Sequence, residues 1–318
     1  MSGNERTAVM LCRPAVRSFA FFLLWVSCGS AFAAPGHPPH TIFFNHSFTV
    51  LDAETANAIE HSDYLKTFGT FEVRTTTANG GETWTGRYIA GKQTYLEFFG
   101  PKDLQGPGVV PGISGLAISP DKAGGLSMIK AALIRQHVKP DISHRTRLYG
   151  KDEIPWFNSV SLPGETQSFE MWAMEYLPSY FDDSRTGREP ADYPGDISRE
   201  RYQPDTYRQK LMRDVSVIEI ACPASDIPPA LALFSAAGFT IRKTKDRLEA
   251  SDGSTTVILD AVPLAEAGWR RVVFDLNALA ADAHIEHIGR SILVVGPGDH
   301  AVWSFPIAAI VYLTQQPR

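Results

Sequence analysis

Hydrophobic and polar positions along residues 41–100 predict four strands and one helix. Four segments are rich in aromatic and β-branched residues, as strands are: TIFFNHSFTVL (41–51), FGTFEVRTTT (68–77), ETWTGRYIAG (82–91) and KQTYLEFFG (92–100). After the first of them, Asp52 stands before a stretch in which Ala and Ile recur on one side, which predicts a short capped helix. The predicted order is β-α-β-β-β.

The same order recurs over residues 112–178. The segment GISGLAIS (112–119) reads as a strand, and Leu126, Ile129 and Leu133 then recur at spacings of three and four, which predicts an amphipathic helix. Three further strands are predicted: ISHRTRLYG (142–150), PWFNSVSLP (155–163) and SFEMWAMEYLP (168–178). Glu175 in the last of them takes the place that Glu97 has in the first repeat.

A third and looser copy follows a polar stretch over 182–213, which we interpret as a linker. The strand VSVIEIACP (215–223) precedes an apolar helix that ends at Gly238, and three strands follow over 239–262. The remainder, from GWRRVVFDLN (268–277) to AVWSFP (301–306), contains strands and turns but no matching helix, as expected for a shortened fourth unit.

The N-terminus has the pattern of a secretory signal. Arg6, Arg13 and Arg17 precede the apolar run SFAFFLLWV, and Ala31-Phe32-Ala33 matches an A-x-A cleavage site. We therefore expect residues 1–33 to be a signal peptide and the protein to be exported, either periplasmic or secreted. An uncleaved anchor and a lipoprotein attached through Cys28 are the alternatives.

The chain divides into five predicted segments, and cleavage of the first would change the net charge. The predicted segments are the signal peptide (1–33), a Pro-rich leader (34–40), paired modules (41–181), a linker (182–213) and a C-terminal module (214–318). Without the first of these, 27 Lys and Arg face 34 Asp and Glu, a net charge of −7. A chain that is acidic and has no basic clusters is a poor candidate for nucleic acid or anionic membranes, so a small molecule is the expected partner.

Only Cys222 would remain, so no internal disulfide is possible and no transmembrane segment is expected after cleavage. Oligomeric state is not predicted.

The repeated unit, with His46 on its first strand and Glu97 on its fourth, resembles the vicinal oxygen chelate superfamily. That superfamily includes glyoxalase I, extradiol dioxygenases and bleomycin-resistance proteins. The segments NHSFTVLD (45–52), FEVRTT (71–76), GETWTGRYIAGKQTYLEFFG (81–100) and WAMEYLP (172–178) are also similar to a family of exported bacterial proteins of unknown function with glyoxalase-like modules. The resemblance implies an α+β fold whose modules pair and form a curved-sheet cleft, with a partly degenerate module at the C-terminus.

The resemblance also implies a metal site. In metal-binding members, the first and fourth strands of each unit supply one ligand each. Carried over by position, the ligands would be His46, Glu97 and Glu175, while the fourth place falls near Gly115 or Leu116, and neither can ligate. One imidazole and two carboxylates suit a divalent metal such as Zn, Fe, Mn or Ni, which would act as a Lewis acid or activate water or oxygen.

The residues of TYLEFFG favour a site at Glu97 for a separate reason. Side chains alternate across a strand, so Tyr95, Glu97 and Phe99 share one face. A carboxylate among aromatic side chains needs a cation, a metal or several hydrogen-bond donors. Glu72 and Arg74 on the neighbouring strand could supply an acid or base and an anion clamp, with Glu175 as a further catalytic group.

Structural interpretations compete with each of these roles. Glu97 could pair with Arg74 or Arg87, and His46 could be a hydrogen-bonded core residue. Glu175 could pair with its sequence neighbours His144, Arg145 or Arg147. Five further residues are candidates for the substrate pocket, although aromatic residues of this kind also form cores: Asn45, Trp84, Tyr88, Tyr95 and Trp156.

Three functions remain open from the sequence. The first is a metal-dependent lyase, isomerase or dioxygenase that acts on a small oxygenated molecule. The second is a non-catalytic protein of the bleomycin-resistance type that binds or sequesters a small molecule in the same cleft. The third is a structural or interaction module. The empty fourth ligand place favours binding, and the pair of His46 and Glu97 favours a metal.

Overall fold

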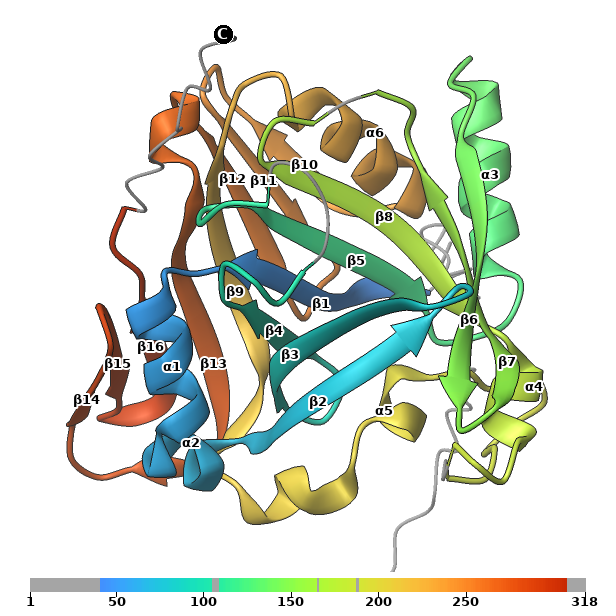
Figure 1. Ribbon diagram of the computed structural model, residues 1–318. Coiled ribbons are helices and arrows are strands. Elements are labelled where there is room, and N and C mark those ends of the chain that lie inside the picture. Colours follow the sequence, from blue (N-terminus) through green and yellow to red (C-terminus); the bar gives the residue numbers. More distant parts are fainter. Residues whose placement is uncertain (1–40, 105–108, 165, 187–188, 308–318) are drawn as a thin grey trace, which may run out of the picture. The chain divides into compact units, whose positions relative to one another are not determined.

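The computed structural model describes residues 41–104, 109–164, 166–186 and 189–307 (Figure 1). The expected signal peptide and Pro-rich leader lie outside the described residues. Within the described ranges, no helix is long and apolar enough to cross a membrane.

The first two repeats form two β-α-β-β-β modules. The first contains β1 (Ile42–Val50), α1 (Ala53–His61), α2 (Asp63–Phe68), β2 (Thr70–Ala78), β3 (Glu82–Ala90) and β4 (Tyr95–Phe99). The second contains β5 (Ser114–Pro120), α3 (Gly125–Arg135), β6 (Asp141–Tyr149), β7 (Asp152–Ser161) and β8 (Phe169–Tyr176). Asp52 caps α1 through its side chain, which accepts a hydrogen bond from the Thr55 amide, as predicted.

The two modules close into one barrel with strand order β1-β4-β3-β2-β6-β7-β8-β5 (Figure 1). The first and last strands of each module are parallel neighbours, β1 with β4 and β5 with β8. The modules join through a long antiparallel pairing of β1 with β5 and, on the other side, through the single pair Ala78–Arg147 of β2 and β6. The paired glyoxalase-like modules that the sequence predicted are therefore present.

The C-terminal part forms an eight-stranded sheet of order β10-β11-β12-β9-β13-β16-β15-β14. Its elements are β9 (Met212–Cys222), α6 (Ile227–Ala237), β10 (Thr240–Lys243), β11 (Arg247–Ser251), β12 (Thr256–Ala261), η2 (Leu264–Glu266), β13 (Gly268–Ala280), β14 (His284–Ile288), β15 (Ser291–Val295) and β16 (Gly298–Ser304). Parallel pairing of β9 with β12 repeats the module pattern. The last strands depart from it, because β13 and β16 are antiparallel and no helix separates β13 from β14.

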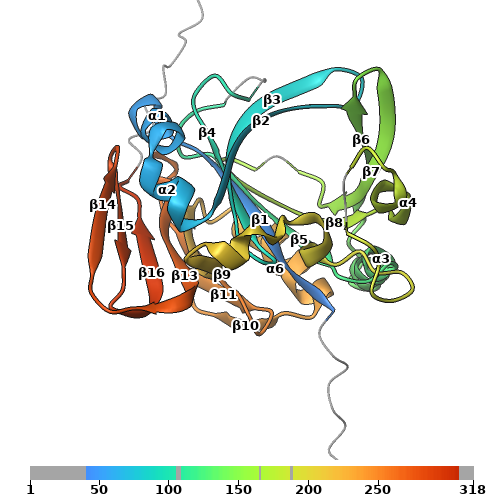
Figure 2. The ribbon, with the colours of Figure 1, turned by 90° about the horizontal axis from the view of Figure 1, so that it is seen from below.

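One hydrophobic core runs through both sheets. On β4, Leu96 and Phe98 turn away from the barrel interior, and the Phe98 ring lies 5.1 Å from the Trp303 ring and 5.6 Å from the Trp269 ring. Figure 2 shows β13 and β16 beside these barrel strands. Helix α6 packs on α3 and β8 and belongs to the same core. Cys222 is buried there, and burial raises the pKa of its thiol to about 12, so it is a structural residue as expected.

The segment interpreted as a linker is more ordered than its composition suggested. It contains the end of α4 (Pro178–Asp182), α5 (Arg199–Tyr202) and η1 (Asp205–Gln209). Arg199 and Tyr202 are buried, and Arg199 donates hydrogen bonds to the Phe44 carbonyl and to Asp121. The polar character of the segment reflects these buried polar contacts as well as exposure to solvent.

Candidate functional site

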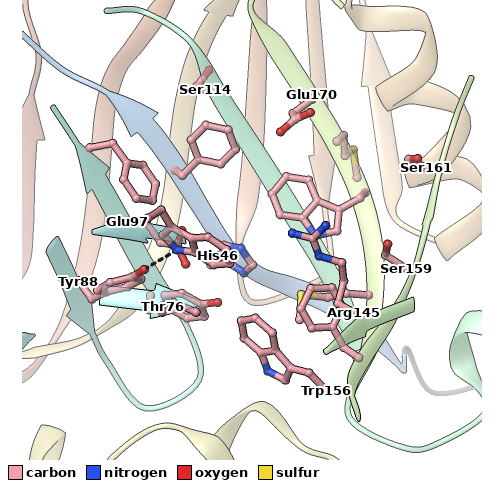
Figure 3. A pocket seen from close by; sticks show the side chains of 18 of the residues that line it. His46, Thr76, Tyr88, Glu97, Ser114, Arg145, Trp156, Ser159, Ser161 and Glu170 are labelled. Atoms are coloured by element: carbon pink, nitrogen blue, oxygen red, sulfur yellow. Dashed lines mark hydrogen bonds between the residues drawn. The ribbon is translucent and has the colours of Figure 1, made fainter. Parts of the chain in front are cut away.

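A cleft of about 1450 Å³ lies between the modules, on the inner faces of the barrel strands (Figure 3). Most of the candidate residues line it: His46, Glu72, Arg74, Trp84, Tyr88, Tyr95, Glu97 and Trp156. Two candidates do not, Asn45 and Glu175. Asn45 is fully buried beneath the wall and is therefore no pocket-lining residue.

The face of β4 that carries Glu97 forms part of the cleft wall. Tyr95, Glu97 and Phe99 all line the cleft, whereas Leu96 and Phe98 face the core, as strand alternation requires. Glu97 lies level with Tyr88 on β3 and with Phe48 on β1, and Tyr95 lies level with His46. The parallel pairing of β1 with β4 therefore places His46 and Glu97 two positions apart on the same wall.

Burial controls the charge of Glu97. It raises the pKa of this carboxyl from 4.5 to about 7, while the nearby Arg74 guanidinium and a hydrogen bond from Tyr95 act in the opposite direction. Burial also raises the pKa values of the Tyr88 and Tyr95 hydroxyls, so both stay protonated and can donate hydrogen bonds. Glu97 can therefore gain or lose a proton near neutral pH.

Arg74 is the cation that faces Glu97. It forms an ion pair with Glu72 on the same strand, and its guanidinium lies 4.2 Å from the centre of the Tyr88 ring. Arg87, the other partner considered for Glu97, points to the opposite face of β3, where it pairs with Glu60 and Asp103. Arg74 therefore acts on Glu97 through its charge, whereas its ion-pair partner is Glu72.

His46 is held in one tautomer by Asn45. Both amide hydrogens of Asn45 are used, because its Nδ2 donates to Ser119 Oγ at 2.7 Å and to the Tyr202 hydroxyl. Its Oδ1 therefore accepts a hydrogen bond from His46 Nδ1, at 2.7 Å, which leaves the lone pair of the imidazole on Nε2. Burial lowers the pKa of His46 to about 3, so the ring is neutral at physiological pH.

A β-bulge in β1 explains why Asn45 is buried behind the cleft wall while its neighbour His46 lines the cleft. The β1–β5 register shifts between Phe44 and His46, so Asn45 is an extra residue in a β-bulge. The His46 ring stacks on the Tyr95 ring, with centroids 4.5 Å apart, and meets Trp172 edge-on at 5.4 Å. These contacts fix the imidazole plane against the cleft wall.

Glu175 lies on the wrong face of β8 for either predicted role. Its carboxylate accepts hydrogen bonds from the backbone amides of Gly124 at 3.0 Å and Leu126 at 2.7 Å, at the start of α3. It therefore holds a helix terminus, and it pairs with none of the three basic neighbours considered from the sequence. Glu175 therefore lies outside the cleft, a position that agrees with neither the ligand role nor the catalytic role expected from the sequence.

Glu170 is the residue of β8 that corresponds to Glu97. In the antiparallel pair of β1 and β5, Phe48 lies opposite Gly115. Glu97 lies level with Phe48 and Glu170 level with Gly115, so the two carboxylates are related by the symmetry between the modules. Glu170 lines the cleft (Figure 3), and the surrounding protein raises the pKa of its carboxyl by partial desolvation. Alternation in SFEMWAMEYLP would have found it, because Glu170 shares a face with Trp172 and Glu175 does not.

The residues present do not fit the metal site that the resemblance implied. Of the three predicted ligands, only His46 and Glu97 share the cleft. The symmetry-related places on β1 and β5 hold Phe48 and Gly115, which cannot ligate. Among the described residues, no group of three or more His, Cys, Asp and Glu side chains could hold a metal ion.

The C-terminal part braces the strands that carry the site. Asp252 accepts a hydrogen bond from the Phe44 amide at 2.7 Å, next to the bulge at Asn45. Asp214 accepts from the amides of Gln93 and Thr94, at 2.7 and 2.9 Å, just before β4. The ends of β1 and β4 that carry His46 and Tyr95 are therefore fixed by residues about 120 to 210 positions away.

Two β-α-β-β-β modules joined around a cleft have the glyoxalase-like arrangement that the sequence resemblance implied. The chain belongs to a family of unknown function (DUF5829), whose model matches residues 44–305.

Several solved structures are similar to this chain at low sequence identity. A hypothetical protein from Staphylococcus aureus has a TM-score of 0.50 and 9% identity, over 80% of this chain and 98% of its own. A halotolerant catechol dioxygenase has a TM-score of 0.41 and 11% identity, over 88% and 91% of the two chains. The Mn(II)-bound glyoxalase from Novosphingobium aromaticivorans has a TM-score of 0.39 and 9% identity, over 82% and 81%. No curated protein matches the chain.

Proposed function

We propose that this protein binds a small organic molecule in the cleft between its modules, without the help of a metal ion. The observation that carries the proposal is the chemistry of the cleft wall. It combines aromatic side chains from both modules, Trp84, Tyr88 and Tyr95 from one and Trp156 and Trp172 from the other, with a few polar groups. Such a composition is typical of small-molecule sites.

The choice against a metal rests on the donor set. A divalent ion would need a third ligand, which Glu175 cannot supply because its carboxylate faces the start of α3. Of the three functions that the sequence left open, non-catalytic binding therefore agrees best with the geometry, and metal-dependent catalysis agrees less well.

A fragment screen by ligand-observed NMR would test the binding proposal. Fragments with one or two aromatic rings should bind wild-type protein, and Trp172→Ala should abolish most of this binding because it removes part of the wall. Trp269→Phe, which changes a core residue outside the cleft, is the matched control and should keep it. Hits that are insensitive to Trp172→Ala, or no hits, would overturn the proposal.

Equilibrium dialysis with Zn²⁺, Mn²⁺, Fe²⁺ and Ni²⁺ would test the claim about the metal. Wild-type protein should bind no more of any of these ions than His46→Ala or Glu97→Gln does. Stoichiometric uptake that either variant abolishes would restore the metal-dependent hypothesis.

Metal-independent proton transfer is a second candidate, favoured by the pKa of Glu97, about 7, near that of an effective general acid or base. His46 Nε2, whose lone pair is available, could accept a hydrogen bond from the same ligand. A ligand recovered unchanged after long incubation, as judged by mass spectrometry, supports binding alone. Conversion that is lost in Glu97→Gln supports catalysis.

We also propose that the protein is exported, on the basis of the basic, apolar and A-x-A segments within residues 1–33. N-terminal sequencing of protein expressed from the full chain should begin at Ala34. A mature N-terminus at Cys28 would indicate the lipoprotein alternative instead.

A further inference from the structure

Three aromatic rings at the base of the cleft, from Phe48, Phe99 and Trp172, form what we call the aromatic floor. The Phe48 ring lies 6.0 Å from the Phe99 ring and 6.1 Å from the Trp172 ring. All three residues line the cleft. The Phe48 and Phe99 ring planes meet at 73° and those of Phe48 and Trp172 at 39°, so the floor presents ring edges as well as ring faces to an apolar ligand.

Gly115 makes room for this floor. A Cβ atom on Gly115 would lie 2.3 Å from a carbon of the Phe48 ring and 3.0 Å from Glu170 Cγ. The ring thus lies directly over the glycine backbone, and the stem of Glu170 lies beside it. Phe48 on β1 and Gly115 on β5 occupy symmetry-related positions, and neither carries a polar ligand. The space beside Gly115 is instead filled by the Phe48 ring, which reaches from the first module to the second.

Carboxylates stand at both ends of the floor. Glu97 lies level with Phe48 on β4, and Glu170 lies level with Gly115 on β8 (Figure 3). Among the described residues, no Lys, Arg or His lies within ion-pair distance of Glu170. Arg74, which faces Glu97, already pairs with Glu72, and His46 is neutral. The floor therefore has an excess of negative charge.

A buried hydroxyl at the Glu170 end also lacks a partner. Ser168 is 5% exposed, lines the cleft and stands two residues before Glu170, on the same face of the chain. Within the described part of the chain, its Oγ has no hydrogen-bond partner. A buried polar atom without a partner is unfavourable, and a ligand N–H beside Glu170 would satisfy it.

Two further cations of the cleft, Arg145 and Arg147, lie on a different wall, and Arg201 on α5 donates its hydrogen bonds to the carbonyls of Glu189 and Asp196. Arg145 on β6 pairs with Glu82, with nitrogen and oxygen 2.8 Å apart. Arg147, also on β6, lies over the Tyr149 and Trp156 rings, 5.1 and 5.3 Å from their centres. These groups do not neutralise Glu97 and Glu170, which belong to the floor strands β4 and β8.

We propose that the aromatic floor binds an organic cation, with an apolar body packed against the rings and protonated amino groups at its ends. Glu170 and Ser168 hold one amino group, and Glu97 holds the other or a second cationic edge. Aromatic rings attract cations through their π faces, and the carboxylates add charge-assisted hydrogen bonds. This inference rests on the proposed function, because it names the class of ligand that the same cleft takes.

Two tricyclic compounds of equal size and opposite charge test the proposal: the 9-aminoacridinium cation and anthracene-9-carboxylate. Calorimetric titration at pH 8 should show that the cation binds at least about tenfold more tightly than the anion. Glu170→Gln and Glu97→Gln should each weaken binding of the cation by about tenfold or more and leave binding of the anion unchanged or improved.

Glu175→Gln is the matched control, because Glu175 lies on the same strand but faces α3. Binding of the cation to this variant should equal that of wild-type protein, and circular dichroism should show that all three variants are folded. Ser168→Ala should weaken binding of the cation less than Glu170→Gln does, because it removes a hydrogen bond to a neutral hydroxyl and not one to a charged carboxylate.

The outcomes separate this inference from the function on which it rests. If the anion binds as tightly as the cation, or if both Glu→Gln variants bind the cation like wild-type protein, the organic-cation proposal is wrong while the binding cleft stands. If neither tricyclic compound binds and the fragment screen also fails, the proposed function itself is overturned.

Discussion

At the scale of single residues, burial acts on Glu97 and His46 in opposite ways. Burial favours the neutral form of each, so it raises the pKa of the Glu97 carboxyl to about 7 and lowers the pKa of the His46 imidazole to about 3. The cleft wall therefore carries a neutral base and a carboxyl that titrates close to neutrality.

Glu97 should make the protein less stable as pH rises from about 4.5 to about 7. Over this range the folded state retains a proton that the unfolded state releases, so ionisation favours unfolding. Arg74, Tyr88, Tyr95 and the neutral His46 face the carboxyl, and only Arg74 carries a charge that offsets its ionisation. The full shift corresponds to at most about 3 kcal/mol, and partial exposure of Glu97 reduces it.

Urea unfolding of Glu97→Gln at pH 5 and pH 8 would measure this effect. The variant should be more stable than wild-type protein at pH 8 by about 1–2 kcal/mol and similar at pH 5. A variant that is less stable at pH 8 would show that Arg74 compensates the carboxylate fully.

Asn45 should determine the tautomer of His46. In wild-type protein, ¹⁵N NMR should show a neutral ring with the proton on Nδ1 at pH 7, and this should persist to about pH 4 because the pKa is about 3. Asn45→Ala removes the acceptor, so the ring should shift toward the Nε2–H form. The exposed pair of His144 and Asn158 provides a control, since Asn158→Ala should leave the His46 signals unchanged. An Nδ1–H ring in Asn45→Ala would contradict this assignment.

The residues of the site differ in how far the sequence could predict them. Alternation along β4 placed Glu97 correctly, because a period of two needs only the local strand. The same alternation favours Glu170, which shares a face of β8 with Trp172, over Glu175, which lies on the other face. The correspondence between the two repeats pointed to Glu175 because it considers the order of the strands and not their faces. The position of the Phe48 ring over Gly115 could not be predicted, because it depends on the register between β1 and β5, strands separated by more than 60 residues.

At the scale of elements, Glu175 links β8 to α3. Helix α3 begins after Gly124, which has a left-handed backbone conformation with φ 102°. Because glycine has no side chain, the first amides of the helix have no side-chain cap from this position. Glu175 supplies the missing acceptor from a neighbouring strand. The sequence predicted the helix correctly, and Asp121, which precedes it in the chain, pairs with Arg199.

Glu175→Ala should therefore destabilise the protein by about 1–2 kcal/mol without changing ligand binding. Urea unfolding and titration with the tricyclic cation would measure the two effects separately. Glu170→Ala is the matched comparison and should show the reverse pattern, with weaker binding and little loss of stability. Loss of binding in Glu175→Ala at full retention of structure would indicate that α3 also shapes the cleft.

At the scale of the whole molecule, the strand order of each module was predictable and the association of the sheets was not. The local pattern of each repeat determines its β-α-β-β-β order. It does not reveal that β4 turns Phe98 toward Trp269 and Trp303, or that Asp214 and Asp252 hold the barrel strands. These contacts join residues far apart in the chain, and they make the C-terminal sheet a support for the cleft wall.

Because one core runs through both sheets, we expect the barrel and the C-terminal sheet to unfold together. Trp303→Ala should lower the free energy of unfolding by about 3–5 kcal/mol, since it leaves a large cavity among Phe98, Phe274 and Phe305. In hydrogen exchange followed by mass spectrometry, peptides from β1 and β4 should then exchange faster by the same factor as peptides from β9. Leu279→Ala, at an exposed position of the same sheet, should change neither. Faster exchange confined to β9–β16 would instead show that the paired modules are an independently stable unit.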